Sequence, residues 1–387
     1  MPTEIKSLKG NRLSPTNSLS SFAMLTRRHC LALTAATLAA PAWSAAKASP
    51  RLLAAWQCEP QDTAEAARYQ IGLLAAQSDA LVVARALDVP TRAHGLLAEA
   101  GGTVLAVARR PGDWLLRWKP GEAEPQTAWI EPDRAFNGHV IASADGQRLY
   151  TTETDLETGA GLIGVRDAAT LEKDEEWASG GMDPHELLLA ADGSLLVANG
   201  GIPTLPETGR LKIGLERMDA SLVRLDTRSG AVQGQWRLPD PRLSLRHIAW
   251  GGQGRQDAVG GRVLGIALQA EHADPAQRQN APLLALFDGR TLRTVDAPRP
   301  LGGYGGDIAW ANGGFAVSTP KVDGFARYGA DGRWQGFTPL AEACALAGEP
   351  GRLWAGGRAQ ALLAEAGAMV ARPVPALRLD NHWLRLG

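Results

Sequence analysis

Residues that can bind a metal ion recur in this sequence at one place in a repeated motif. The motif is a small or polar residue, a histidine and an apolar run, and it occurs five times. Two further copies carry an aspartate and a cysteine in the histidine position. The seven candidate metal ligands are His94, His139, His185, His247, His382, Asp307 and Cys344. Imidazole, carboxylate and thiolate together form a mixed donor set that suits several transition metals.

The spacing of these residues predicts a ring of repeats. In chain order the intervals are 45, 46, 62, 60, 37 and 38 residues. The end of the chain and its first apolar segments, near residue 50, complete a seventh interval. Repeats of this length that each contain four short strands are typical of β-propellers. We therefore expect an all-β fold, a single seven-bladed β-propeller with four-stranded blades.

The unit that begins at His139 shows the four expected strands most clearly. Val140–Ala142 and Leu149–Thr152 flank an Asp-Gly turn, which is typical of a hairpin. Leu162–Val165 is the third strand, and the fourth surrounds Trp177. If the first strand of each unit is innermost, all seven candidate ligands lie at one end of the central channel.

Both ends of the chain are expected to share one blade. Leu52–Trp56, Ile71–Leu74 and Leu81–Ala84 would supply its second, third and fourth strands. The last segment, His382–Leu386, would supply the missing first strand. This closure leaves no open sheet edge between the first and last blades.

The N-terminal region predicts export from the cytoplasm. Arg27-Arg28 precede an apolar run from Leu31 to Ala40, and small residues near Ala45 suit a cleavage site. This layout is typical of a twin-arginine signal peptide, and the run is shorter than the ~20 residues that span a bilayer. We expect residues 1–45 to hold an upstream extension and this signal, and residues 46–387 to form the propeller in the periplasm. An uncleaved membrane anchor is the alternative.

Composition argues against several classes of partner. The formal net charge of −1 favours neither nucleic acid nor an anionic membrane surface. We expect no membrane span in the mature chain, and a monomer. Cys58 and Cys344 are the cysteines left after signal removal, which permits one disulfide without requiring it. Gly-x-Ser-x-Gly, His-Glu-x-x-His and P-loop motifs are absent from the sequence.

Other polar residues are expected near the candidate ligands. Arg109, Glu153 and Asn199 end second strands, and Arg246 directly precedes His247. We expect Arg109, Glu153, Asn199 and Arg246 to contact whatever binds there. Long connections at 154–161, 200–220 and 270–281 lie on the same face, and loops on one face of a rigid scaffold often carry binding.

A structural role for the histidines is the alternative to a metal site. In WD-type propellers a Gly-His dipeptide before the first strand is a fold signature, and Gly138-His139 matches it. That interpretation also predicts a Trp-Asp pair at the end of the third strand, which this sequence lacks. Among metal-binding arrangements, neighbouring histidines such as His139 with His185 are the expected pairs, because the channel is several ångströms wide.

Several short motifs occur along the mature chain. They are Gly138-His139, Tyr150–Glu153, Gly164-Val165, Pro184–Leu187, Val197–Gly201, Ser221-Leu222, Leu245–His247 and Asp380–His382. Together these motifs resemble the bacterial domain-of-unknown-function family 1513. The resemblance covers nearly the whole mature chain and departs from the family at 252–262 and 301–306. It implies a twin-arginine-exported, propeller-like periplasmic protein, similar to those found beside imelysin-type and di-haem peroxidase-like proteins in iron-uptake gene clusters.

These observations favour a non-enzymatic periplasmic protein that acquires or handles a metal. The resemblance implies that the metal is iron. Copper and zinc also suit the ligands. Other periplasmic iron-uptake proteins are the expected partners. One alternative is a metal-dependent propeller hydrolase of lactones or esters, in which the ion polarises a carbonyl and activates water. Another is a scaffold that binds a protein through the loops at 200–220 and 270–281.

Overall fold

The computed structural model describes residues 51–58, 67–203, 212, 214–252, 263–365, 367–374 and 377–386. The chain divides into two units, residues 1–48 and 49–387, and the second contains every described residue. The predicted signal peptide lies outside the described residues.

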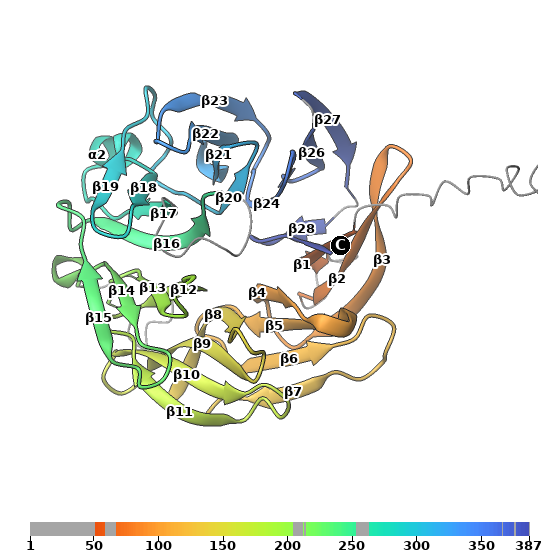
Figure 1. The fold of residues 1–387 in the computed structure, drawn as a ribbon. Helices are drawn as coiled ribbons and strands as arrows, with labels where there is room; N and C mark the ends of the chain where they lie inside the picture. The colour runs from red at the N-terminus through yellow and green to blue at the C-terminus, as the bar shows by residue number, and fades with distance from the viewer. Residues whose placement is uncertain are drawn as a thin grey trace, which may run out of the picture. The chain divides into compact units, whose positions relative to one another are not determined.

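Seven antiparallel sheets form the blades of a β-propeller (Figure 1), which confirms the predicted fold. Six of the sheets have four strands that follow one another in chain order. Their strands are β4 (Ala93–Ala98), β5 (Val104–Ala108), β6 (Trp114–Trp118) and β7 (Gln126–Trp129); β8 (Arg134–Ala142), β9 (Arg148–Asp155), β10 (Gly161–Asp167) and β11 (Lys173–Ala178); β12 (Pro184–Leu189), β13 (Leu195–Asn199), β14 (Ser221–Leu225) and β15 (Val232–Trp236); β16 (Leu243–Trp250), β17 (Leu264–Ala270), β18 (Leu284–Phe287) and β19 (Leu292–Val295); β20 (Ile308–Ala311), β21 (Gly314–Thr319), β22 (Gly324–Gly329) and β23 (Trp334–Pro339); β24 (Ala345–Glu349), β25 (Arg352–Gly356), β26 (Gln360–Glu365) and β27 (Ala368–Pro373).

The remaining blade joins the two ends of the described chain, as the sequence predicts. It contains β1 (Arg51–Cys58), β2 (Tyr69–Gln77) and β3 (Ala80–Val89), and β1 pairs with both β28 (Leu377–Leu379) and β29 (Leu384–Leu386). The innermost strand of this blade is therefore split in two. His382 lies in the interruption with a φ of 70°, so the expected strand begins two residues later than predicted.

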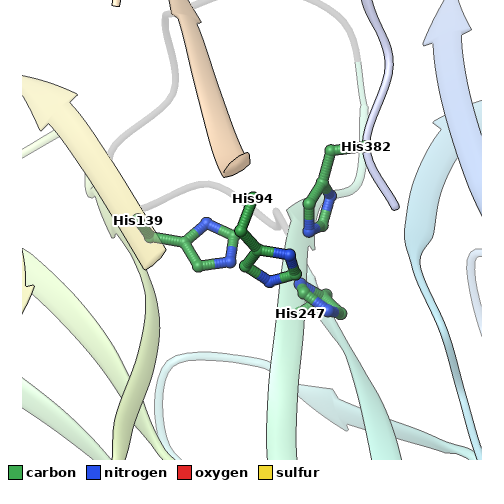
Figure 2. Close-up of side chains that lie close together, drawn as sticks. All are labelled: His94, His139, His247 and His382. Carbon is green, nitrogen blue, oxygen red and sulfur yellow. The ribbon is translucent and has the colours of Figure 1, made fainter. Parts of the chain in front are cut away.

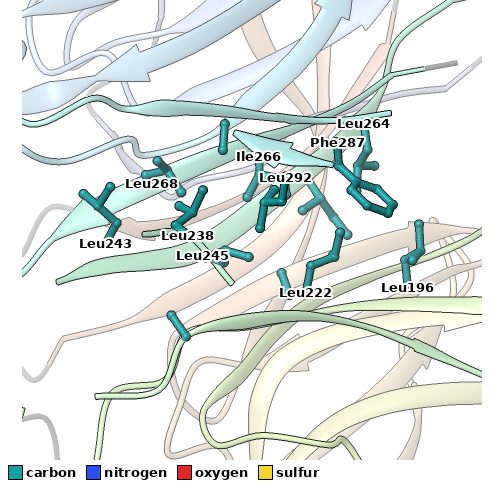
Figure 3. Packing of buried hydrophobic residues seen from close by; sticks show 14 of the residues in the cluster. Leu196, Leu222, Leu238, Leu243, Leu245, Leu264, Ile266, Leu268, Phe287 and Leu292 are labelled. Atoms are coloured by element: carbon teal, nitrogen blue, oxygen red, sulfur yellow. The ribbon is translucent and has the colours of Figure 1, made fainter. Parts of the chain in front are cut away.

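Apolar clusters fill the spaces between neighbouring blades. In the cluster of Figure 3, Leu196 and Leu222 belong to one blade, and Leu245, Ile266 and Phe287 belong to the next. Six more clusters lie between the other pairs of neighbours. Each blade is thus held on both sides by buried apolar contacts, which fixes the positions of the innermost strands around the channel.

Helix contributes little to the described residues. Their one α-helix is α2 (Pro275–Asn280), which lies in the connection expected at 270–281. Asp274 caps it by accepting a hydrogen bond from the amide of Ala276. None of the described helices has the length and hydropathy required to cross a membrane.

The innermost strands are irregular where they carry histidine. Pairing with the second strand is interrupted beside His94, His139, His185 and His247. A bulge of this kind breaks the two-residue alternation of a strand and redirects a side chain. The strands that follow Asp307 and Cys344, β20 and β24, pair without interruption. The histidine positions are therefore distinguished by backbone irregularity as well as by residue type.

Candidate metal centre in the channel

Four histidines from four blades meet in the channel (Figure 2). His94, His139, His247 and His382 each offer an imidazole nitrogen, and these atoms all lie within 4.8 Å of one another. The cluster joins blades that are not neighbours, since the ring centroids of His94 and His247 are 5.6 Å apart. The site thus extends across the channel, beyond the neighbouring pairs that the sequence led us to expect.

His185 lies against the same cluster. Its Nε2 is 3.1 Å from Nε2 of His247, and its ring centroid is 5.1 Å from that of His139. Two neutral imidazoles at this distance require one ring to donate its N–H to the other. His185 is therefore a hydrogen-bond partner of one histidine of the cluster.

Many of the imidazole nitrogens lack a partner within the protein. Six of these buried atoms make no hydrogen bond: both nitrogens of His94, Nε2 of His139, Nδ1 of His185, Nδ1 of His247 and Nε2 of His382. Each buried polar group left without a partner costs about 1–3 kcal/mol. A ligand in the channel can satisfy several of these atoms, and a metal ion that accepts imidazole lone pairs is a chemically suitable partner.

A single carboxylate supports two of the rings from behind. Glu186 lies 3.7 Å from Nδ1 of His139 and 3.4 Å from Nδ1 of His247. Its other role is structural, because Oε2 accepts a hydrogen bond of 2.7 Å from the amide of Ile248. Carboxylates that face the outer nitrogen of a metal-binding histidine orient the ring and raise its basicity.

Asp307 plays the corresponding part for His382. One carboxylate oxygen, Oδ1, is 3.1 Å from Nδ1 of His382. The other, Oδ2, accepts a hydrogen bond of 2.8 Å from the amide of Leu346 in the next blade. Asp307 was predicted to be a ligand, but the structure places it beside a histidine of the cluster, where it can orient that ring.

The electrostatic setting keeps most of the rings neutral. Burial lowers the pKa of His94, His139, His185 and His247 well below the usual value of a histidine. Burial also acts to lower the pKa of His382, but the Asp307 carboxylate opposes it and the net pKa is raised. Neutral imidazole is the form that binds metals, so four of the rings are in that form at neutral pH.

Cys344 lies outside the cluster. Its Sγ is 3.7 Å from the carbonyl oxygen of Leu379 and 3.8 Å from that of Gly356. Burial raises the pKa of its thiol to about 12, so the thiolate form that binds metals is disfavoured. Cys58 and Cys344 are both free thiols that pack against the same apolar cluster, so the disulfide that the sequence permits is not formed.

Glu153 and Asn199 make structural contacts, Glu153 within its own blade and Asn199 to the end of the preceding blade. The fully buried Glu153 carboxylate accepts a hydrogen bond of 2.7 Å from Arg166 and lies 3.2 Å from Nζ of Lys173. Asn199 exchanges side-chain and backbone hydrogen bonds with Ser179. Asn199 ends its second strand and Glu153 lies near the end of its own, but both side chains are committed to partners within the protein.

The histidines line two cavities that differ in charge, mainly acidic in the first, where Arg385 is the one arginine of the described lining, and basic in the second. The first, about 580 Å³, is lined by residues that follow the histidines along the innermost strands, and Glu186, Asp307 and Glu349 contribute its acidic groups. We call it the wide cavity. The second, about 80 Å³, is lined by His94, His185 and His247 and by four basic residues, Arg109, Arg110, Lys212 and Arg246. We call it the basic chamber. Arg109 and Arg246 therefore lie beside the histidines, and their contact with a bound ligand stays a prediction.

Sequence reasoning missed the acidic residues that support this region. Glu186 directly follows His185, and strict strand alternation would have pointed it away from its neighbour. Asp183 and Asp380 each lie two positions before a histidine and pair with arginines. A polar residue at that position precedes four of the five histidines, and this is the signal that could have revealed them.

Two further observations concern the loops. His272, outside the cluster, contacts Asp240 at 2.9 Å in a partly buried pair. Part of the 200–220 loop, which with 270–281 would carry the scaffold alternative, lies outside the described residues.

The fold and the cluster together define a seven-bladed propeller with a histidine-rich channel site. The chain belongs to the family described as "Protein of unknown function (DUF1513)", whose sequence model matches residues 87–386. This match confirms the resemblance drawn from the motifs. A search of curated proteins finds no match.

Solved structures share the architecture at low sequence identity. A chain of Kuenenia stuttgartiensis hydrazine synthase is 10% identical with a TM-score of 0.55, covering 79% of this chain and 92% of that one. A chain of a nidogen/laminin complex is also 10% identical with a TM-score of 0.48, covering 87% and 98%. The first likeness shows the fold alone.

Proposed function

We propose that this protein binds a divalent transition-metal ion in the channel, through His94, His139, His247 and His382. One observation carries the proposal: four imidazoles from four blades place their nitrogens within 4.8 Å of one another. Several buried nitrogens of the cluster have no hydrogen-bond partner, and a bound ion would accept their lone pairs.

The dimensions suit a single ion after a small adjustment. Metal–imidazole bonds of about 2.0–2.1 Å put ligand nitrogens roughly 3.4 Å apart in a tetrahedral site and roughly 4.2 Å apart across a square. The observed spread of 4.8 Å is larger by about an ångström. Small rotations of buried rings toward an ion supply a contraction of that size.

The donor set favours borderline metals. Imidazole nitrogen suits iron, nickel, copper and zinc, whereas calcium and magnesium prefer oxygen. Copper and zinc bind such sites more tightly than iron at equal availability, so supply decides which ion is carried. Within this proposal iron is the cargo, the periplasm is the compartment and other iron-uptake proteins are the partners, following the family resemblance and the twin-arginine motif.

The arrangement supports binding more than hydrolysis. A hydrolytic site of the kind considered above would hold a hard ion through carboxylates and keep a position open for water. Here Glu186 and Asp307 face the outer nitrogens of the histidines, behind the cluster. The carboxylates therefore contact the imidazoles, and the imidazoles would bind the ion.

Elemental mass spectrometry tests the proposal on protein purified without chelator or His-tag, then dialysed in turn against iron, nickel, copper and zinc. We compare the wild type with His139→Ala and His382→Ala. His272→Ala is the matched control, because it removes a histidine that pairs with Asp240 outside the cluster. Folding of each variant is checked by circular dichroism.

The wild type and His272→Ala are expected to hold one ion per chain, and both cluster variants to lose it. A folded wild type that takes up none of the four metals would overturn the proposal. Full metal content in folded His139→Ala and His382→Ala would also do so.

A further inference from the structure

The basic chamber concentrates positive charge in a partly enclosed space. The side chains of Arg109 and Arg110 are each 15% exposed and that of Arg246 is 6% exposed. None of the described residues that line the chamber is acidic. Asn137, Gln269, Tyr304 and Asn381 complete its polar wall, and all four side chains can donate hydrogen bonds.

Carboxylates neutralise part of this charge from behind the wall. Asp183, almost fully buried, forms ion pairs with both Arg110 and Arg246, the latter at 2.8 Å. Glu271 pairs with Lys212. Each of these carboxylates is committed to cations and is absent from the lining.

Asp380 is shared in the same way. It accepts a hydrogen bond of 2.9 Å from Arg92, and Arg109 lies 4.0 Å from it. Among the described residues around the chamber, five cations therefore share three carboxylates in the ion pairs named here. The cations are Arg92, Arg109, Arg110, Lys212 and Arg246, and the carboxylates are Asp183, Glu271 and Asp380. Like charges crowded away from water repel strongly, and an anion between them relieves the repulsion.

The floor of the chamber offers further unsatisfied donors. His94 and His185 line it and are 3% and 4% exposed. Both nitrogens of His94 and Nδ1 of His185 have no hydrogen-bond partner. A neutral imidazole carries one N–H, so a ligand oxygen in the chamber can accept from the floor as well as from the arginines.

Size and charge select the class of ligand. A cavity needs about 10–15 Å³ to hold one water, so about 80 Å³ holds one small polyatomic ion and excludes a nucleotide or a peptide. A metal cation would be repelled by this wall and attracted by the acidic groups of the wide cavity. The two cavities are therefore suited to ligands of opposite charge.

We infer that the basic chamber is a binding site for a small oxyanion, such as a carboxylate, carbonate or phosphate group, directly beside the histidine cluster. The cations that form it are present without a metal, so the anion binds to the metal-free protein. When an ion occupies the cluster, the anion lies next to it and offsets its charge.

The structure supplies variants that remove charge and leave the buried carboxylates partnered. In Arg110→Gln, Asp183 keeps Arg246, and in Arg109→Gln, Asp380 keeps Arg92. Arg237→Gln is the matched control, because it removes one positive charge from an exposed pair with Asp219.

Isothermal titration calorimetry on the metal-free protein tests the inference, with phosphate, bicarbonate, citrate and oxalate in separate titrations at fixed ionic strength. At least one of them is expected to bind with one anion per chain, and the tightest identifies the source. Loss of a charge-assisted hydrogen bond should weaken binding about ten- to a hundredfold in Arg109→Gln and Arg110→Gln. Arg237→Gln should bind as the wild type does.

The inference fails if none of the four anions binds the wild type, or if Arg237→Gln weakens binding as much as the chamber variants. His139→Ala separates this result from the metal proposal, because His139 lines the wide cavity and not the chamber. That variant should lose metal and retain the anion.

Discussion

Replacing Asp307 by asparagine tests whether the cluster is built to hold a metal. In the wild type, three groups face this carboxylate: Nδ1 of His382 at 3.1 Å, and the amides of Ile308 and Leu346, each at 2.8 Å. A carboxylate accepts from all three. Asparagine has almost the same shape, but its NH₂ group must face at least one of these donors.

The expected loss follows from the place of Asp307 behind His382, one of the four proposed ligands. Removing such an outer partner typically costs 10- to 100-fold in metal affinity, which corresponds to roughly 1.4–2.7 kcal/mol. The carboxylate is also the main group that raises the pKa of His382. Asp307→Asn therefore lowers the basicity of the imidazole that donates to the ion.

A chelator competition titration measures the change in affinity for the ion identified by mass spectrometry. Asp323→Asn is the control, because Asp323 also accepts a backbone hydrogen bond, from Glu342 at 2.8 Å, but lies at an exposed site. Thermal melting of both metal-free variants separates lost affinity from lost stability. Equal affinity in Asp307→Asn and the wild type would refute the reasoning, as would an equal loss in Asp323→Asn.

Three further predictions concern the metal-free fold and the cysteine. The four histidines with lowered pKa values are neutral in the folded protein, but in the unfolded chain they bind protons below about pH 6.5. The free energy of unfolding should therefore fall as the pH drops from about 7 to 5, by up to about 1.4 kcal/mol per pH unit for each histidine. His382, whose pKa is raised, opposes this trend, because its stabilising contribution is complete below about pH 6.5 and is lost at higher pH. Urea unfolding that shows constant or rising stability toward pH 5 would contradict the expected net direction. Trp383→Ala should cost about 3–5 kcal/mol of unfolding free energy in urea titrations, because the buried ring packs against Gly356 where the ends of the chain meet, and an unchanged midpoint would show that this contact is dispensable. Cys344→Ala should retain the full metal content of the wild type by mass spectrometry, since the thiol lies among carbonyl groups, and metal loss in a folded variant would restore it as a ligand.

The sequence alone was sufficient for the architecture, because its signals are local. An Asp-Gly turn between two apolar runs specifies a hairpin wherever it occurs, and β8 and β9 form around the turn that the sequence indicates. The spacing of the seven candidate ligands predicted the number of blades. The unpaired strands at the two ends of the chain predicted the pairing of β1 with β29. The same repeat pattern predicted that the five histidines lie at one end of the channel.

The functions of individual side chains were decided by tertiary structure. Glu186 faces His139 and His247 because a bulge redirects its strand and a third blade brings His247 within reach. Glu153 was expected near the site, but its partner Arg166 lies in the neighbouring strand and holds it inside the blade. Side-chain direction depends on strand irregularities and on contacts between residues far apart in sequence, and the residue pattern records neither. The sequence therefore determined where the histidines gather, and the packing of the blades decided which groups support them.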